Sequence, residues 1–331
     1  MATGAGAVDI RDLDLVASSV NLEHEALGIV PIEHAVAHPH DHPLLRLVTW
    51  FVAFALLAVT AYFLSKLFAV GSVAVVWQLV VDTVTSRGFI ASALVGLLAQ
   101  TIDGALGMAY GLTANTFLMS TGVPPAVATA SVHIAEVFTT GLSGVSHIRM
   151  GNVNKDLFLR LLIPGVLGAV GGAVLVTQID GAVLKPYISA YLVIMGIYVL
   201  SKAWRHAQRP HREPHHVGKL ALFGGFIDSV GGGGWGPVVT TSLVGAGRDP
   251  RTTIGSVNLA EFFLTLSSAV SFSVLMGEST WPAVGGLVFG GMFAAPLAAV
   301  LTRRLNTRVL LTLVGSLITL LSLYNLYRAL G

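Results

Sequence analysis

Long apolar runs separated by short polar stretches dominate the chain and predict membrane-spanning helices. Residues 47–69 form the first run, and from residue 88 to residue 330 apolar segments of similar length follow one another. About 20 apolar residues cross a bilayer as a helix, whereas a β-barrel would show short alternating segments. We therefore predict an all-α polytopic membrane protein. The short run 73–84 fits either an interfacial helix or part of a longer one.

The apolar part of the chain consists of two related halves, 88–205 and 219–331, joined by the basic linker 206–218. A shift of 125 residues aligns 102–146 with the second half without a gap, and 17 of these 45 positions are identical. Shared apolar composition alone would not align acids and proline. The aligned pairs include Asp103 with Asp228, Glu136 with Glu261, and Pro125 with Pro250. Each half thus holds four apolar units. The rest of the chain is a polar tail, 1–46, and an extra N-terminal span with the short apolar segment, 47–87.

The first apolar unit of each half contains a break in its middle. In the second half it reads IDSVGGGGWG, residues 227–236. Four consecutive glycines end a helix, because each costs roughly 1 kcal/mol against alanine. The units 88–122 and 219–247 are longer than one crossing of a ~30 Å hydrocarbon core requires. We therefore predict that each unit forms a re-entrant hairpin of two half-helices, with its irregular backbone facing a protein cavity.

Basic residues predict how the halves are oriented. The linker and its borders carry Lys202, Arg205, Arg209, Arg212 and Lys219. Positive charge marks the cytoplasmic side. The arginines that follow residue 247 lie on the cytoplasmic side only if the segment 219–247 both enters and leaves the membrane from that side. The hairpin of the first half then enters the membrane from outside. We therefore predict an inverted-topology repeat with a hairpin and three crossings in each half, as in many secondary transporters. With 47–69 the chain has about seven spans.

Four carboxylic acids lie within the apolar halves. Glu136 belongs to a polar stripe whose steps of three and four residues place it on one helix face: Thr129, His133, Glu136, Thr140, Ser143 and His147. A charged carboxylate at mid-bilayer costs at least ~2.5 kcal/mol, which favours a functional role. The alternative role is structural, as caps of broken helices or as hydrogen-bond partners between the halves.

Lys and Arg are confined to the ends of the apolar units, so an anionic substrate would be bound by half-helix N-termini, glycine amides and neutral donors. The candidate substrate-binding residues are Gly231, Gly232, Gly233, Gly234, Trp235, Asn258, His133, Asn115 and Thr113. The candidate proton-coupling residues are Glu136, Glu261, Asp103 and Asp228, because desolvation favours a protonated carboxyl group. Asp228 fits a cap or gate better than a principal ligand. His133 fits either a proton relay or a satisfied structural histidine.

Several other functions find less support. The chain lacks nucleotide-binding and HExxH motifs, so any pumping must use a gradient, and we expect no enzyme activity, cofactor or metal site. Gly141–Gly144 has the GxSG form of rhomboid-type proteases, but the aligned segment of the second half lacks both glycines. The tail carries His34, His38, His40 and His42, which fit a solvated tail better than a metal site. Without cysteine there is no disulfide or thiolate site. Because the basic residues lie at the ends of apolar runs, we expect no nucleic-acid partner.

The duplicated unit, the stretch IDSVGGGGWGPVV, the NLAEFF segment Asn258–Phe263 and the long polar tail resemble the TauE/SafE family of sulfite and organosulfur-anion exporters. The resemblance covers about 88–330. It implies a secondary transporter of the bacterial plasma membrane that exports sulfite, sulfoacetate or a similar anion, coupled to protons. The first-half copy of the motif lacks the glycine run, so we expect unequal anion coordination. The main alternative is an inverted-repeat cation exchanger whose four carboxylates bind Na⁺ or Ca²⁺. The third alternative is a channel.

Overall fold

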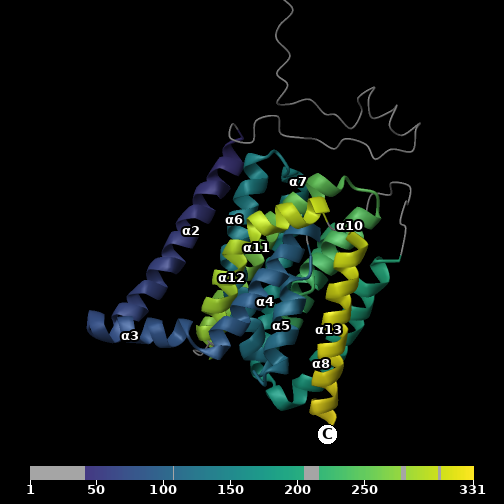
Figure 1. Cartoon of the computed structure of the whole chain (residues 1–331). Helices are drawn as coiled ribbons and strands as arrows, with labels where there is room; N and C mark the ends of the chain where they lie inside the picture. Colours follow the sequence, from purple (N-terminus) through teal and green to yellow (C-terminus); the bar gives the residue numbers. More distant parts are fainter. Residues whose placement is uncertain (1–41, 107, 205–215, 277–280, 305–306) are drawn as a thin grey trace, which may run out of the picture.

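The computed structural model is helical throughout the residues that it describes, which contain no β-strand (Figure 1). These residues are 42–106, 108–204, 216–276, 281–304 and 307–331. The tail up to residue 41, with His34, His38 and His40, and the linker residues 205–215 lie outside the described residues. The predicted all-α polytopic fold is confirmed.

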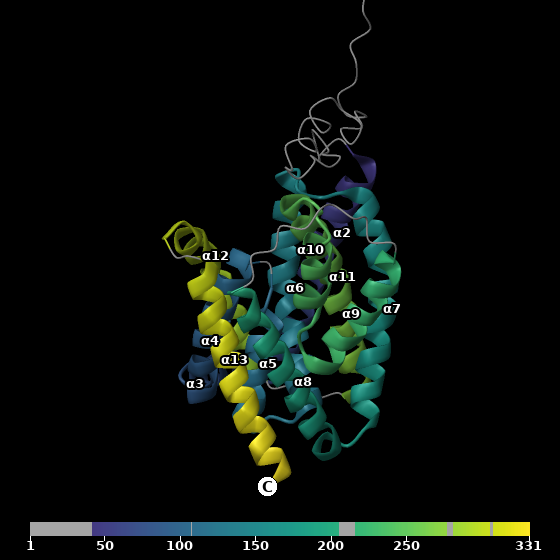
Figure 2. The same cartoon turned by 90° about the vertical axis from the view of Figure 1, so that its right-hand side faces the viewer.

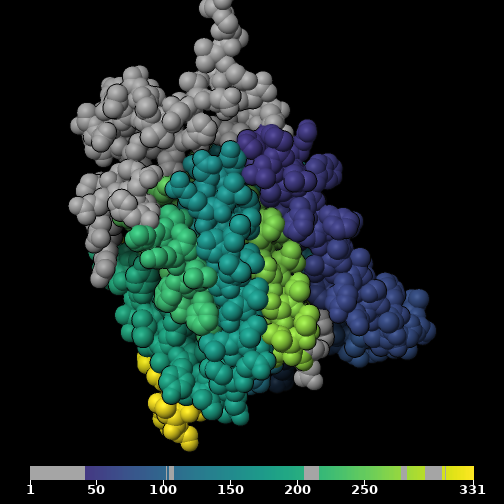
Figure 3. All heavy atoms as spheres, turned by 180° about the vertical axis from the view of Figure 1, so that it is seen from behind, coloured from purple at the N-terminus to yellow at the C-terminus, as the bar shows by residue number. Residues whose placement is uncertain are grey.

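Two helices precede the first repeat, α2 (Pro43–Phe68) and α3 (Val73–Val84). α2 packs on α6 and buries one face of its first half, and the other parts of its surface carry exposed apolar side chains such as Phe54 and Leu57. Side chains of this kind need lipid rather than water around them. Figure 3 shows α2 along the flank of the bundle and α3 projecting beyond it. α3 and the first part of α4 are bent by 61° relative to each other.

Each repeat consists of a broken helix followed by three long helices. The first repeat contains α4 (Arg87–Leu106), α5 (Tyr110–Ser120), α6 (Pro125–Arg149), α7 (Lys155–Gln178) and α8 (Gly181–Lys202). The second contains α9 (Val217–Gly231), the π-helix η3 (Gly236–Thr240), α10 (Thr241–Gly245), α11 (Pro250–Met276), α12 (Trp281–Arg304) and α13 (Thr307–Leu330). The boundaries of equivalent elements repeat with the shift found in the sequence, and α6 and α11 both begin at a proline.

The two hairpins enter the bundle from opposite ends. In Figures 1 and 2, α10 lies at the end where α2 begins, whereas α5 lies toward the end where the chain terminates. The helix breaks fall between Leu106 and Tyr110 and between Gly231 and Gly236, inside the predicted stretches. The predicted arrangement of two inverted repeats with re-entrant hairpins is therefore present.

The two repeats are interlocked rather than side by side. α4 of the first repeat packs along α12 of the second, and α9 of the second packs along α7 of the first. Glycine makes these contacts possible, because a Cβ added at Gly172 of α7 would lie 2.5 Å from the carbonyl oxygen of Phe226. Small residues of this kind let helix backbones approach closely in a membrane. α6 pairs with α11, and α8 with α13.

Five described helices are long and apolar enough to cross a membrane alone: α2, α7, α8, α11 and the part Leu311–Leu330 of α13. The seven crossings that we expected also include α6 and α12. α6 has 25 residues, but its polar stripe lowers its hydropathy. That stripe is buried at Thr129, His133, Glu136 and Thr140 and half-buried at Ser143 and His147, so it faces the interior.

Candidate functional site

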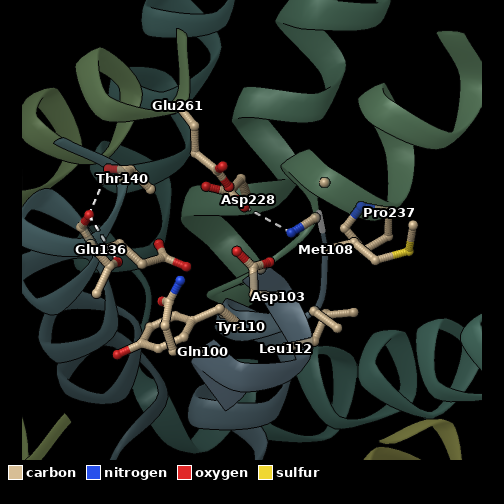
Figure 4. A pocket seen from close by; sticks show the side chains of 16 residues that line it. Gln100, Asp103, Met108, Tyr110, Leu112, Glu136, Thr140, Asp228, Pro237 and Glu261 are labelled. Carbon is tan, nitrogen blue, oxygen red and sulfur yellow. Dashed lines mark hydrogen bonds between the residues drawn. The ribbon is translucent and has the colours of Figure 1, made fainter. Parts of the chain in front are cut away.

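A small cavity lies where the two hairpin breaks meet inside the bundle. Its volume is about 10 Å³, the room that one water molecule needs. Figure 4 shows four acidic side chains around it, Asp103 from α4, Glu136 from α6, Asp228 from α9 and Glu261 from α11. Glu136 is 4% and Asp228 is 2% exposed. Two symmetry-related pairs of acids therefore converge on one point from four helices.

The two breaks touch each other through glycine backbone. A Cβ added at Gly111 would lie 2.5 Å from the carbonyl oxygen of Gly232 and 3.0 Å from an Oε atom of Glu136. A Cβ added at Gly233 would collide with the backbone of Gly111 and Leu112. Gly232 ends α9 in the left-handed conformation, with φ of 66°, which glycine adopts without the penalty of a side chain. The glycine run therefore allows the two hairpin tips to meet without side chains between them.

Asp228 satisfies most of the backbone N–H groups of the second tip. Its Oδ1 accepts the amides of Gly234 at 2.7 Å and Trp235 at 2.9 Å, and its backbone oxygen accepts those of Gly232 and Gly233. A carboxylate is a strong acceptor for such amides. In this conformation the four N–H groups are bonded to Asp228, so they are not available to a substrate.

His133 and Asp228 share a proton. Nδ1 of His133 lies 2.8 Å from the carbonyl oxygen of Thr129, which can only accept, so Nδ1 carries a hydrogen. Nε2 lies 3.2 Å from Oδ2 of Asp228. That contact needs a hydrogen either on the imidazole or on the carboxyl group. The buried pair thus holds one exchangeable proton, and His133 is 0% exposed.

Three further side chains hold the second tip. Asn115 of α5 donates to the carbonyl oxygen of Gly231 at 2.6 Å, and the Tyr191 hydroxyl of α8 donates to that of Gly233 at 2.8 Å. The fully buried Trp235 donates through its indole nitrogen to the carbonyl oxygen of Val257 at 3.0 Å. The second tip is therefore tied to α5, α6, α8 and α11.

Fewer contacts are found for the first tip among the described residues, which do not include residue 107. Asp103, the counterpart of Asp228, interacts with the backbone N–H of Tyr110. The counterpart of His133 is Asn258, whose Oδ1 has no hydrogen-bond partner within the described part of the chain. Ala109 has φ of 88°, a conformation that costs an L-residue roughly 1–2 kcal/mol. The two tips therefore share their position in the repeat but not their bracing.

Three of the four acids at the cavity lack a basic partner in the described part of the chain. The ion pairs found among the described residues join His133 to Asp228 and Lys155 to Asp156, so no lysine or arginine of these residues pairs with Asp103, Glu136 or Glu261. Buried charges are stable only when they are balanced. Protons or a bound cation must therefore balance these carboxyl groups.

His133, Glu136 and Asp228 each bring one possible metal-ligand atom within 4.8 Å of the others. In this conformation the group offers no open metal site, because Nε2 of His133 and Oδ2 of Asp228 contact each other and Oδ1 of Asp228 accepts two backbone amides. A transition-metal or calcium ion needs these atoms as free ligands.

The predicted site residues divide into two groups in the structure. Gly233, Gly234 and the four acids line the cavity. The others do not line it: Gly231, Gly232, Trp235, Asn115, His133, Asn258 and Thr113. The Thr113 hydroxyl instead donates to the carbonyl oxygen of Ala109. Their role in substrate binding stays a prediction.

Sequence reasoning missed three polar residues at the cavity, Gln100, Thr139 and Thr140, as substrate contacts. Gln100 lies three residues before Asp103, and Thr139 lies three residues after Glu136. Helical spacing from the acids would have found both.

Comparison with known proteins gives consistent matches. The family model described as "Sulfite exporter TauE/SafE" matches residues 92–325. The "Probable membrane transporter protein YtnM" of Bacillus subtilis (strain 168) is 43% identical over 246 residues, 71% of this chain and 82% of that protein. The "Probable membrane transporter protein ORF9" of Sinorhizobium sp is 30% identical over 151 residues, 45% of this chain and 56% of that protein.

A "Probable membrane transporter protein" of Haemophilus influenzae is 26% identical over 209 residues, 62% of this chain and 81% of that protein. No solved structure is significantly similar. Two repeats that enclose an acidic cavity, and a family match that covers both of them, lead to one assignment. The chain belongs to the TauE/SafE family of sulfite exporters and is a membrane transporter.

Proposed function

We propose that this transporter exports a small sulfur-containing anion, such as sulfite or sulfoacetate, across the bacterial plasma membrane and couples its movement to protons. The main support is the set of three cavity acids for which the described residues supply no basic partner, next to a His133–Asp228 pair that holds a proton. An anion can enter such a site only when the carboxyl groups are protonated. Substrate binding and proton binding are then linked at one place.

The size of the cavity supports alternating access. At about 10 Å³ it holds roughly one water molecule and no sulfite ion, so the tips must separate before a substrate binds. The hairpins open toward opposite ends of the bundle. Separation at one hairpin would expose the cavity to one side of the membrane, and separation at the other would expose it to the opposite side.

Flux measurements in proteoliposomes test this function. We expect sulfite flux that follows an imposed pH gradient, and at least a tenfold loss in Glu261→Gln, because the amide cannot release a proton. Ser271→Ala is a control on the same helix, since Ser271 bonds only within α11. Sulfite flux that ignores the pH gradient would remove proton coupling from the proposal.

An inverted-repeat cation exchanger is the second candidate, because four carboxyl groups surround the cavity. The same vesicles distinguish the two functions. Na⁺ or Ca²⁺ flux with no response to sulfite would establish the exchanger and refute the anion exporter. In either case we propose that the protein moves its substrate without catalysing a covalent reaction.

The proposed orientation places the linker 206–218 in the cytoplasm, because of its basic residues. Reporter fusions after Gly247 and after residue 277 test it. We expect the first on the linker's side and the second on the opposite side. A fusion after Gly247 that reports the side opposite to the linker would contradict the orientation.

A further inference from the structure

A half-buried lysine lies directly beside the cavity on the side where the linker begins. Lys202 is the last residue of α8, and its Nζ donates to the sulfur of Met108 at 3.4 Å and to the hydroxyl of Thr241. Met108 lies in the break of the first hairpin and lines the cavity, and Thr241 is the first residue of α10 in the outgoing arm of the second. The ammonium group therefore contacts both hairpins. From the sequence alone Lys202 was only a topology signal at the end of an apolar unit.

The charge of Lys202 has no acidic partner in the described part of the chain. The ion pairs of that part do not include it, and its neighbours are a thioether, a hydroxyl and the ring of Tyr198, whose centroid lies 5.4 Å from Nζ. An ammonium group has three hydrogens to donate, and these contacts use two. A partly desolvated, unbalanced cation with an unused donor favours an anion.

The second repeat has a cation at the matching position, which shows what is special about Lys202. A shift of 126 residues relates Tyr198 and Lys202 to Tyr324 and Arg328, and Arg328 lies 5.8 Å from the Tyr324 ring centroid. Arg328 is exposed, however, and the hydroxyl of Thr116, the counterpart of Thr241, is buried without a partner within the described residues. In this conformation only the linker-side cation reaches the hairpins.

We propose that Lys202 is the residue that binds the anionic substrate at the linker-side entrance of the cavity and selects for negative charge. The proposal rests on the proposed function, since it assigns a residue to anion entry from that side. The residues that line the cavity offer an anion four carboxyl groups and neutral donors such as Gln100, but no lysine or arginine, and the amides of the second tip are occupied by Asp228. Lys202 supplies the attraction that these groups lack, and the anion moves inward when the tips separate.

Initial-rate measurements of sulfite transport test Lys202, with sulfite added on the linker side of oriented vesicles. We expect Lys202→Gln to raise KM at least about tenfold and to change the maximal rate less than about twofold, as for loss of a group that binds the substrate before the slow step. Lys202→Arg keeps the charge, and we expect KM within about threefold of wild type. Added salt should raise the wild-type KM toward the Lys202→Gln value, because ions screen the attraction.

Two further variants distinguish an effect of the Lys202 charge from an effect of its contact with the second hairpin. Thr241→Val removes the tether of Lys202 and keeps its charge, so KM should stay within about twofold. Arg328→Gln removes the matching cation at the other end and should leave linker-side KM unchanged. An unchanged KM in Lys202→Gln, or an equal rise in Thr241→Val, would overturn the assignment.

A binding measurement keeps this test independent of transport. Sulfite should raise the thermal unfolding midpoint of the wild-type protein in detergent more than that of Lys202→Gln. If the wild-type protein binds sulfite but does not transport it, the proposed function is refuted, and the comparison of the two thermal shifts still tests the role of Lys202. Equal sulfite-dependent shifts in both proteins would refute the role of Lys202, and a wild type without flux or shift would refute both.

Discussion

The second hairpin tip is tied to four helices, α5, α6, α8 and α11, whereas few contacts of the first tip, at the equivalent place in the fold, are found among the described residues. Asp228 bonds four backbone N–H groups and a histidine, while among the described residues, which exclude residue 107, Asp103 interacts with the backbone N–H of Tyr110. Alternating access requires two barriers that open in turn. If the protein works by alternating access, as we propose, the contacts of the described residues lead us to expect that the first tip separates at a lower free-energy cost than the second.

Contact between the tips should be the most sensitive part of the molecule. We expect Gly111→Val to reduce transport more than about a hundredfold, because any Cβ there meets the Gly232 carbonyl oxygen at 2.5 Å and the tips cannot close. Gly245→Ala, where an added Cβ meets nothing within 4 Å, is the matched control in the second hairpin. Near-normal sulfite flux in Gly111→Val would show that the tips do not need to meet.

Removal of the two aspartate charges should affect the tips differently. We expect Asp228→Asn to lower the free energy of unfolding by roughly 3–5 kcal/mol, since a buried carboxylate that pairs with His133 and two amides is lost. Asp103→Asn should cost about 1 kcal/mol, the value of one hydrogen bond. Thermal unfolding in detergent measures both. Equal losses would mean that the bracing does not differ.

Replacement of His133 tests whether this residue causes the difference in stability between the two hairpin tips. His133→Asn gives the second tip the residue of the first, and we expect a loss of about 1–3 kcal/mol, because Asp228 keeps its amides but loses its side-chain partner. Asn258→His is the reciprocal change. If His133→Asn leaves stability and the pH dependence of flux unchanged, the proton held by the pair has no part in coupling.

Relief of the strained backbone should have the smallest effect. Ala109→Gly is expected to stabilise the protein by about 0.5–1 kcal/mol, because glycine adopts φ of 88° without a steric penalty but loses more entropy on folding. The control Ala114→Gly lies inside α5 and should destabilise by a similar amount. Destabilisation by Ala109→Gly would show that its methyl group contributes packing that outweighs the strain.

Much of the fold could be predicted from the sequence because the duplication and the charge distribution are both visible there. The shift that aligns Pro125 with Pro250 also relates the helix starts, and the glycine run marks the second break. The packing of α4 along α12 could not be predicted, because the apolar composition of a helix face does not specify which other helix packs against it.

Some features of the site depended on contacts that only the structure provides. The four acids were predicted from their position in apolar segments, and they converge on the cavity. The occupation of the glycine amides by Asp228, and the approach of Lys202 to both hairpins, arise from tertiary packing. In the sequence Lys202 only marks the cytoplasmic end of an apolar run, and position in a run does not show which way a long side chain extends.

The interlocked repeats have a consequence for biosynthesis. α4 packs along α12, which begins roughly 175 residues after α4 ends, so at ~5–20 residues per second the first hairpin waits about 10–35 s for its partner. During that time α4 lacks the helix along which it packs. A ribosome-bound chain that stops before α12 should therefore depend on the insertion machinery or a membrane chaperone, and a stable half-protein is not expected.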